Sequence, residues 1–167
     1  YMIVSVADSV GNKFVIRRIH GQCDPHENAA IYADADGYIT VAQSSRGDWR
    51  KGFIFKSVQP YDITQFKQIA SGYYAYPKIT EKGIVYTRYY GSTRKTRFRS
   101  NDGSDVMLVD AGSYSTVTEG VDGSIHVLYD FHINGDLTRR VNLYYMWSPD
   151  GVSWFNKKKK KLALPVS

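Results

Sequence analysis

The chain has 167 residues, the length of one ordinary domain, and a net charge of +6. Its single cysteine, Cys23, excludes an internal disulfide and a cysteine-based metal site. No run of apolar residues approaches the ~20 that a membrane-spanning helix needs, so no membrane partner is expected.

The predicted elements are all short strands, because apolar and polar residues alternate between turn residues and no window shows helical periodicity. The first 19 residues are expected to form a hairpin around Ser9–Asn12. Further strands are expected at 26–33, 38–43, 52–58, 65–69, 73–80, 84–90, 96–100, 106–109, 114–118, 124–129 and 143–147, with a last one opening at 154–155.

Three segments repeat one pattern, a turn that ends in glycine followed by a strand. The glycines are Gly37, Gly83 and Gly123, spaced 46 and 40 residues apart. A four-stranded unit recurring every ~40–50 residues is typical of a β-propeller blade; an irregular β-sandwich is the alternative. We therefore expect an all-β chain of β-propeller blades, each of four antiparallel strands, at about 23–70, 71–111 and 112–160, with a partial blade at 1–22.

Propellers have about four to eight blades, and the first residue here is not Met. The chain is therefore expected to be an excerpt of a larger propeller. The remaining blades of the same protein would then be partners of this segment.

In each predicted unit the first strand begins, and the second strand ends, at the same rim. A propeller lines its ligand funnel there, so this rim is the expected site. It would collect imidazole, phenol and guanidinium groups, which suit an acidic sugar. These residues are His26, Arg46, Tyr73, Tyr74, Tyr76, Arg88, Tyr90, Tyr114 and His132.

Two basic segments add to the charge. The segment Arg88–Arg99 indicates an anionic partner, although Arg97 and Arg99 are expected on a solvated face. No nucleic-acid-binding motif accompanies it, so no nucleic acid is expected. The run Lys157–Lys161 is expected to be a solvated edge that blocks strand pairing.

Several motifs carry a family resemblance: Asp24-Pro-His-Glu-Asn28, Asp36-Gly-Tyr-Ile-Thr-Val41, Tyr76-Pro-Lys78, Thr87-Arg-Tyr-Tyr90 and Tyr144-Tyr-Met-Trp-Ser-Pro-Asp-Gly151. Together they resemble the BNR-repeat, sialidase-like β-propellers, a family that includes ulvan lyases. The turn Ser148-Pro-Asp-Gly-Val-Ser-Trp154 is similar to the Asp-box of these propellers, one residue shorter between Asp and Gly. That turn makes Asp150 a capping residue and not a catalytic candidate.

The resemblance implies a secreted or periplasmic polysaccharide lyase. It would cleave a uronate-containing, ulvan-like polymer, sulfated or not, by β-elimination. Arg88 would neutralise the uronate carboxylate, His26 would remove the proton, and Tyr73 or Tyr74 would protonate the leaving oxygen. Asn28 would orient the substrate or His26. The other rim residues would bind the substrate: Arg46, Tyr76, Tyr90, Tyr114 and His132.

One departure from the ulvan lyase pattern concerns a second histidine, expected where Ser44-Ser-Arg46 stands. A sialidase-like glycoside hydrolase is the alternative enzyme, and it would need a carboxylate pair from Glu27, Asp48 and Asp130. A non-catalytic, glycan-binding propeller is the third reading. No cofactor is expected, and the sequence leaves room for a structural metal ion.

Overall fold

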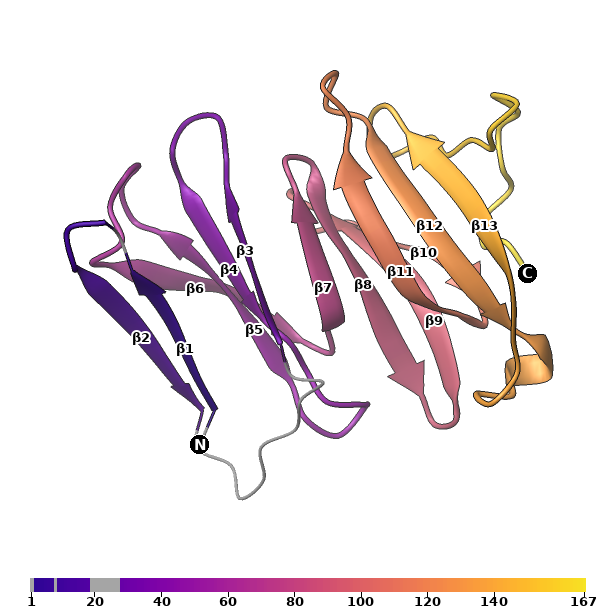
Figure 1. Cartoon of the computed structure of the whole chain (residues 1–167), viewed down its shortest axis with the longest axis horizontal. Helices are drawn as coiled ribbons and strands as arrows, with labels where there is room; N and C mark the ends of the chain where they lie inside the picture. The colour runs from indigo at the N-terminus through magenta and orange to yellow at the C-terminus, as the bar shows by residue number, and fades with distance from the viewer. Residues whose placement is uncertain (1, 8, 19–27) are drawn as a thin grey trace. The chain divides into compact units, whose positions relative to one another are not determined.

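The computed structural model describes residues 2–7, 9–18 and 28–167, and Figure 1 shows that they form antiparallel sheets. The all-β class is confirmed: among the described residues the only helical element is the 3-10 turn η1 (Ile133–Gly135). No helix in this part of the chain is long and apolar enough to cross a bilayer. The chain divides into two compact units, Tyr1–Ile79 and Thr80–Ser167.

The first unit carries the expected opening hairpin and then a four-stranded antiparallel sheet. The sheet is a meander, in which each strand pairs with the next along the chain, in the order β3-β4-β5-β6. The strands of this unit are β1 (Met2–Ala7), β2 (Lys13–Arg18), β3 (Ala29–Ala33), β4 (Ile39–Gln43), β5 (Gly52–Ser57) and β6 (Phe66–Gly72).

One face of this sheet carries a small apolar core around Val41 and Ile63, both less than 10% exposed. The β3–β4 turn depends on Gly37, which has a φ of +86°. A Cβ atom there would lie within 2.7 Å of the Tyr61 ring, whose backbone N–H donates to the Gly37 carbonyl. A glycine is therefore required both by the backbone conformation and by the close approach.

The later strands form two more meanders, one of four strands in the order β10-β9-β8-β7 and one of three strands. The boundary between the two units falls at the end of β7. The strands are β7 (Ala75–Thr80), β8 (Gly83–Tyr90), β9 (Thr93–Ser100), β10 (Asp105–Asp110), β11 (Gly112–Glu119), β12 (Ile125–His132) and β13 (Arg140–Ser148).

The core of the second unit lies between these two sheets. The buried residues alternate along β12, which is the pattern of a strand with one buried face, whereas two consecutive residues of β10 are buried at its bulge. The fully buried members are Val85, Phe98, Leu108, Val109, Ile125, Val127 and Met146.

The C-terminal segment closes one edge of this core. The N–H of Val166 donates to the carbonyl of Leu108 at 2.9 Å, and that of Asp110 donates to Val166 at 2.8 Å. The segment therefore covers the free edge of β10, which would otherwise expose unpaired backbone groups.

The Asp-box-like turn has the expected structural role. Asp150 accepts hydrogen bonds from the backbone N–H groups of Val152 at 2.8 Å and Ser153 at 2.7 Å. Burial alone would raise the pKa of Asp150, but these bonds outweigh it and lower the pKa. Trp154 is then 1% exposed, with its ring 5.7 Å from that of Phe98.

Three strand predictions are wrong in part. Tyr73 and Tyr74 were expected inside a strand, but they form the connection between β6 and β7. The strand expected from His26 begins only at Ala29, with residues 26 and 27 outside the described residues. No strand opens at Trp154: Phe155 makes only isolated bridges, because the chain turns at Asn156 directly after it.

Candidate functional site

The strongest candidate site lies at one end of the second unit, where β8 and β12 end and β9, β11 and β13 begin (Figure 1). Two of the predicted rim residues, Tyr114 and His132, lie there. Two arginines that the sequence did not place at the rim join them, one of them from the basic segment Arg88–Arg99. We call these four residues the strand-end cluster: Arg94, Tyr114, His132 and Arg140.

Tyr114 is the centre of the cluster. Pairing of β11 with β12 shifts register between Ser113 and Thr116, and Tyr114 has a left-handed backbone with φ +52°. Such a bulge changes the direction of a side chain relative to a regular strand. The ring contacts two cations, with the guanidinium of Arg140 at 4.4 Å and that of Arg94 at 4.8 Å from its centroid.

The two arginines are held differently. Arg94, in β9, also lies 5.0 Å from the ring of Tyr89, so two phenol rings fix its guanidinium. Arg140 is the first residue of β13 and is exposed. Among the described residues its guanidinium has no ion-pair partner, so its donors point to solvent or ligand. A guanidinium with free donors is suited to a carboxylate.

His132 is the most deeply buried member, with only 1% of its surface exposed. Within the described part of the chain neither ring nitrogen has a hydrogen-bond partner. Burial lowers the pKa of His132; the charge of Asp130 opposes this and the charges of Arg94 and Arg140 add to it. The imidazole is therefore neutral at pH 7 and can accept a proton.

A cavity of about 450 Å³ opens beside His132. Its other polar lining side chains come from Thr93, Asp110, Asn134 and Ser167. Nearby, Oδ1 of Asp130 is buried with no hydrogen-bond partner in the described structure. Buried polar atoms without protein partners are typical of sites that hold ordered water or a polar ligand.

Arg88 and Tyr90, also predicted at the rim, lie on the other face of β8. Side chains alternate along a strand, and Tyr89 between them is the residue that contacts Arg94. The Arg88 guanidinium lies 5.0 Å from the Tyr90 ring. The structure therefore brings these two together, but apart from Tyr114.

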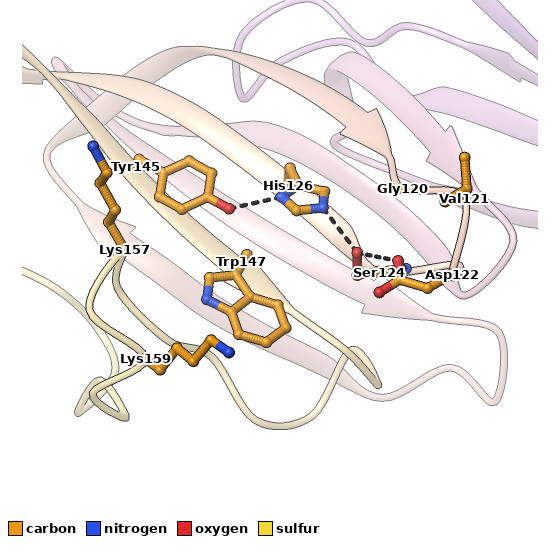
Figure 2. Close-up of a pocket in the computed structure, with 9 residues that line it drawn as sticks. All are labelled: Gly120, Val121, Asp122, Ser124, His126, Tyr145, Trp147, Lys157 and Lys159. Atoms are coloured by element: carbon orange, nitrogen blue, oxygen red, sulfur yellow. Dashed lines mark hydrogen bonds between the residues drawn. The ribbon is translucent and has the colours of Figure 1, made fainter.

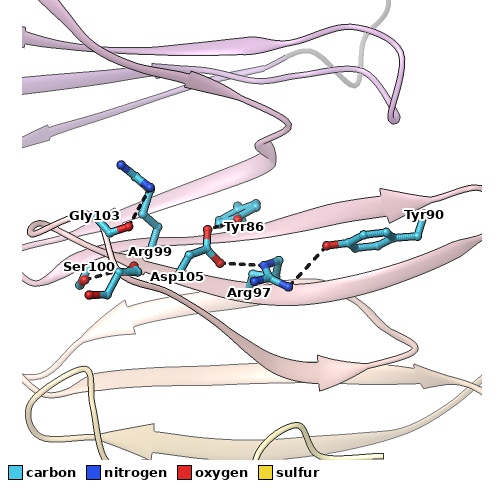
Figure 3. A network of polar contacts seen from close by, with 8 residues as sticks. Tyr86, Tyr90, Arg97, Arg99, Ser100, Gly103 and Asp105 are labelled. Carbon is cyan, nitrogen blue, oxygen red and sulfur yellow. Dashed lines mark hydrogen bonds and ion pairs between the residues drawn. The ribbon is translucent and has the colours of Figure 1, made fainter.

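Tyr90 also touches a structural ion pair, shown in Figure 3. Arg97 donates to Asp105 at 2.7 Å and makes a long 3.5 Å contact with the Tyr90 hydroxyl. The Tyr86 hydroxyl donates to the same carboxylate, and burial raises the pKa of Tyr86. Arg97 is thus paired, on the face of β9 opposite buried Phe98, and Arg99 on the same face donates to the Gly103 carbonyl at 3.0 Å.

In the first unit, the end of β4 meets the start of β7, as the rim prediction requires. The N–H of Ser45 donates to the Tyr74 carbonyl at 2.9 Å, and the N–H of Tyr76 donates to Ser44 Oγ at 3.1 Å. Tyr74 is buried and Tyr73 is half-buried. Tyr76 has a left-handed backbone, φ +50°.

Three further residues of this unit were predicted at the rim or as substrate-orienting: Asn28, Arg46 and His26. Asn28 accepts the N–H of Ser44 through its backbone carbonyl at 3.2 Å. Arg46 is half-buried, in a loop closed by paired backbone bonds with Arg50. His26 lies outside the described residues. Sequence reasoning missed Gln43, which is fully buried with an amide that has no partner among the described residues.

Comparison with known proteins adds no family. No protein-family model matches the chain, and no curated protein matches it. The functional assignment therefore depends on the geometry above and on the sequence motifs.

Proposed function

We propose that the protein is part of a carbohydrate-active β-propeller, a polysaccharide lyase that cleaves an acidic polymer by β-elimination. The observation that carries this proposal is the strand-end cluster, in which two guanidinium groups contact one tyrosine ring beside a buried, neutral histidine. Such a cluster offers guanidinium groups for the carboxylate of an acidic sugar, an aromatic ring for the sugar ring, and a histidine that can accept a proton.

Uronate binding follows from the charges and the ring. The exposed donors of Arg140 can bind a carboxylate in bidentate fashion. Neutralising the uronate carboxylate in this way makes the proton on the neighbouring C5 carbon more acidic. The Tyr114 ring offers an apolar face with a polar edge, against which a sugar ring can lie. Arg88 with Tyr90 offers a second pairing of the same kind on the other face of β8.

The elimination needs a base and an acid. The base removes the C5 proton, a C4–C5 double bond forms, the C4–O4 bond breaks, and the leaving oxygen takes a proton. The family resemblance assigns the base to His26 and the acid to Tyr73 or Tyr74. Among the described residues His132 has the matching chemistry, because its lowered pKa leaves a neutral ring nitrogen without a partner.

The propeller assignment is supported by the order of the sheets. Two four-stranded meanders and a three-stranded one follow each other along the chain, as blades do. In the second unit, Trp154 of the Asp-box-like turn packs against Phe98 of the neighbouring sheet. For the alternative hydrolase, the carboxylate of its proposed pair that belongs to the second unit is Asp130, which lies near the cluster.

The proposal is tested by incubating the protein with polyuronates and with a neutral polymer of similar length. A lyase produces an ultraviolet-absorbing unsaturated uronate from the acidic polymer only. New reducing ends without that absorbance would instead show a hydrolase, and binding without turnover would show a glycan-binding module. An absence of both binding and turnover on every acidic polymer would contradict the proposal.

A further inference from the structure

A second group of functional side chains lies on the outer face of β12 and β13. Ile125 and Val127 face the core, so alternation places His126 on the opposite face, beside Tyr145 and Trp147. Figure 2 shows the three rings lining one pocket, and the volume of this pocket is about 710 Å³. The pocket is near the start of β12, whereas His132 of the strand-end cluster ends that strand.

The three rings lie side by side with nearly parallel planes. The centroids of His126 and Tyr145 are 6.0 Å apart with an interplanar angle of 25°, and Nδ1 lies 2.7 Å from the Tyr145 hydroxyl. A hydrogen bond between ring edges at this spacing means that the rings lie edge to edge rather than face to face. Trp147 is 6.4 Å from His126 at 19°. Such a surface can receive the apolar face of a sugar ring.

A directed chain of hydrogen bonds fixes the polar edge of this surface. Ser124 Oγ donates its one proton to Asp122 Oδ1 at 2.6 Å, so towards His126 Nε2 at 2.8 Å it can only accept. Nε2 therefore carries a proton, and in the tautomer protonated only there Nδ1 accepts from the Tyr145 hydroxyl. The Tyr145 oxygen is left with lone pairs that can accept sugar hydroxyls.

Asp122 offers further acceptor capacity at the same edge. Hydrogen bonds from the Ser124 hydroxyl and backbone N–H lower the pKa of Asp122, so its carboxylate stays ionised. This end of the pocket therefore favours hydroxyl donors and repels a chain of phosphodiesters.

The opposite side of the pocket is cationic. Lys157 and Lys159 line it, and among the described residues neither ammonium group forms an ion pair. Asn156 holds the loop: its backbone carbonyl accepts the Trp147 indole N–H at 3.2 Å and the Lys159 N–H at 2.9 Å. Lys159 has φ +59°, so the loop has a specific conformation and is not a loose charged run.

We propose that this pocket is a second carbohydrate site, which binds an acidic saccharide residue. The sugar ring lies on the aromatic surface, its carboxylate or sulfate pairs with the two lysines, and its hydroxyls donate to Tyr145 and Asp122. The site is separate from the strand-end cluster and does not require that the protein be a lyase. Single-stranded nucleic acid also stacks on aromatic surfaces beside cations, but the ionised Asp122 disfavours its backbone here.

The test is an NMR titration of the tryptophan indole signals with a galacturonic acid trisaccharide. The chain has 3 Trp, and the variant Trp147→Phe identifies the Trp147 signal by its loss. We expect that signal to shift. Binding at the strand-end cluster alone would leave it in place, since that cluster contains no Trp, and would overturn the second site without affecting the proposed function.

Two matched double variants of the lysine run complete the test. Lys157→Ala with Lys159→Ala removes the lining charges and should weaken binding at Trp147 about tenfold, the scale of two exposed ion pairs. Lys158→Ala with Lys160→Ala changes the net charge equally and should weaken it less than about twofold. The proposal is overturned by equal effects of the two pairs, by a larger Trp147 shift with an oligothymidylate, or by self-association that covers the face.

Discussion

Two tyrosines that the sequence places at the rim, Tyr76 and Tyr114, have left-handed backbones with φ of +50° and +52°. A bulky L-residue in this conformation costs about 1–3 kcal/mol and persists only where its surroundings fix it. Strain of this kind collects at functional sites. For Tyr114 the result is a ring aimed between two guanidinium groups.

His132 gives a pH-dependent prediction. Burial lowers its pKa below the ordinary value of 6.5. As the pH falls, His132 is therefore protonated in the unfolded state before it is protonated in the folded state. The stability that the neutral imidazole contributes is thus present above pH 6.5 and is lost as the pH falls towards the folded-state pKa. The loss cannot exceed about 1.4 kcal/mol per pH unit, the limit for one proton.

Denaturant unfolding of the protein and of His132→Gln measures this effect. The free energy of unfolding of the unsubstituted protein should fall more steeply below pH 6.5 than that of the variant, because glutamine does not titrate. Parallel curves would show that His132 protonates equally in both states, and that the imidazole is not kept neutral by burial.

At the scale of elements, we expect the Asp-box-like turn to contribute to the stability of the fold but not to ligand binding at the strand-end cluster. Asp150→Ala removes acceptors for the backbone N–H groups of Val152 and Ser153, which should cost about 1–2 kcal/mol of unfolding free energy. Asp150→Asn keeps a side-chain oxygen and should recover part of the loss. Thermal or denaturant unfolding gives the values.

Binding at the strand-end cluster should be the same in both Asp150 variants, since the turn lies at the other end of the sheet from that cluster. A loss of binding at the strand-end cluster in Asp150→Ala, with the fold retained, would mean that the turn takes part in that site.

Most strands could be predicted because their signals are local. Gly37 and Gly123 have φ of +86° and +72°, and Asp34 and Asp122 in the same turns accept hydrogen bonds from the backbone N–H groups of Tyr38 and Ser124. Tyr73 and Tyr74 could not be placed, because they are the whole connection between β6 and β7 and tyrosine favours strands over turns. The residue at which a strand ends depends on which backbone groups pair with another strand, and that strand can be distant in the sequence.

The candidate site was predictable only in part. Tyr114 and His132 could be placed at one rim from strand order alone. Arg94 and Arg140 could not, because their meeting depends on the bulge at Tyr114 and on the packing of two sheets. Arg88 was assigned to the same funnel, but a difference of one residue from Tyr89 puts it on the other face of β8.

At the scale of the whole molecule, the chain has a net charge of +6, and some of its basic side chains are grouped in pairs. In the second unit, Arg94 and Arg140 gather near the end of β12, and Lys157 and Lys159 line the pocket near its start. Each pair of cations lies beside aromatic rings. An acidic polysaccharide carries both features that such surfaces bind, a regular charge and a sugar ring with an apolar face.

The most direct test of the account compares two neighbouring arginines. Arg139 and Arg140 are both exposed, but only Arg140 contacts the Tyr114 ring. Calorimetric titration with an oligouronate should show that Arg140→Ala weakens binding at least about fivefold, the scale of a charge-assisted hydrogen bond, while Arg139→Ala changes it less than about twofold. Equal effects of the two substitutions, or no effect of Arg140→Ala, would contradict the proposal that the strand-end cluster binds an acidic sugar.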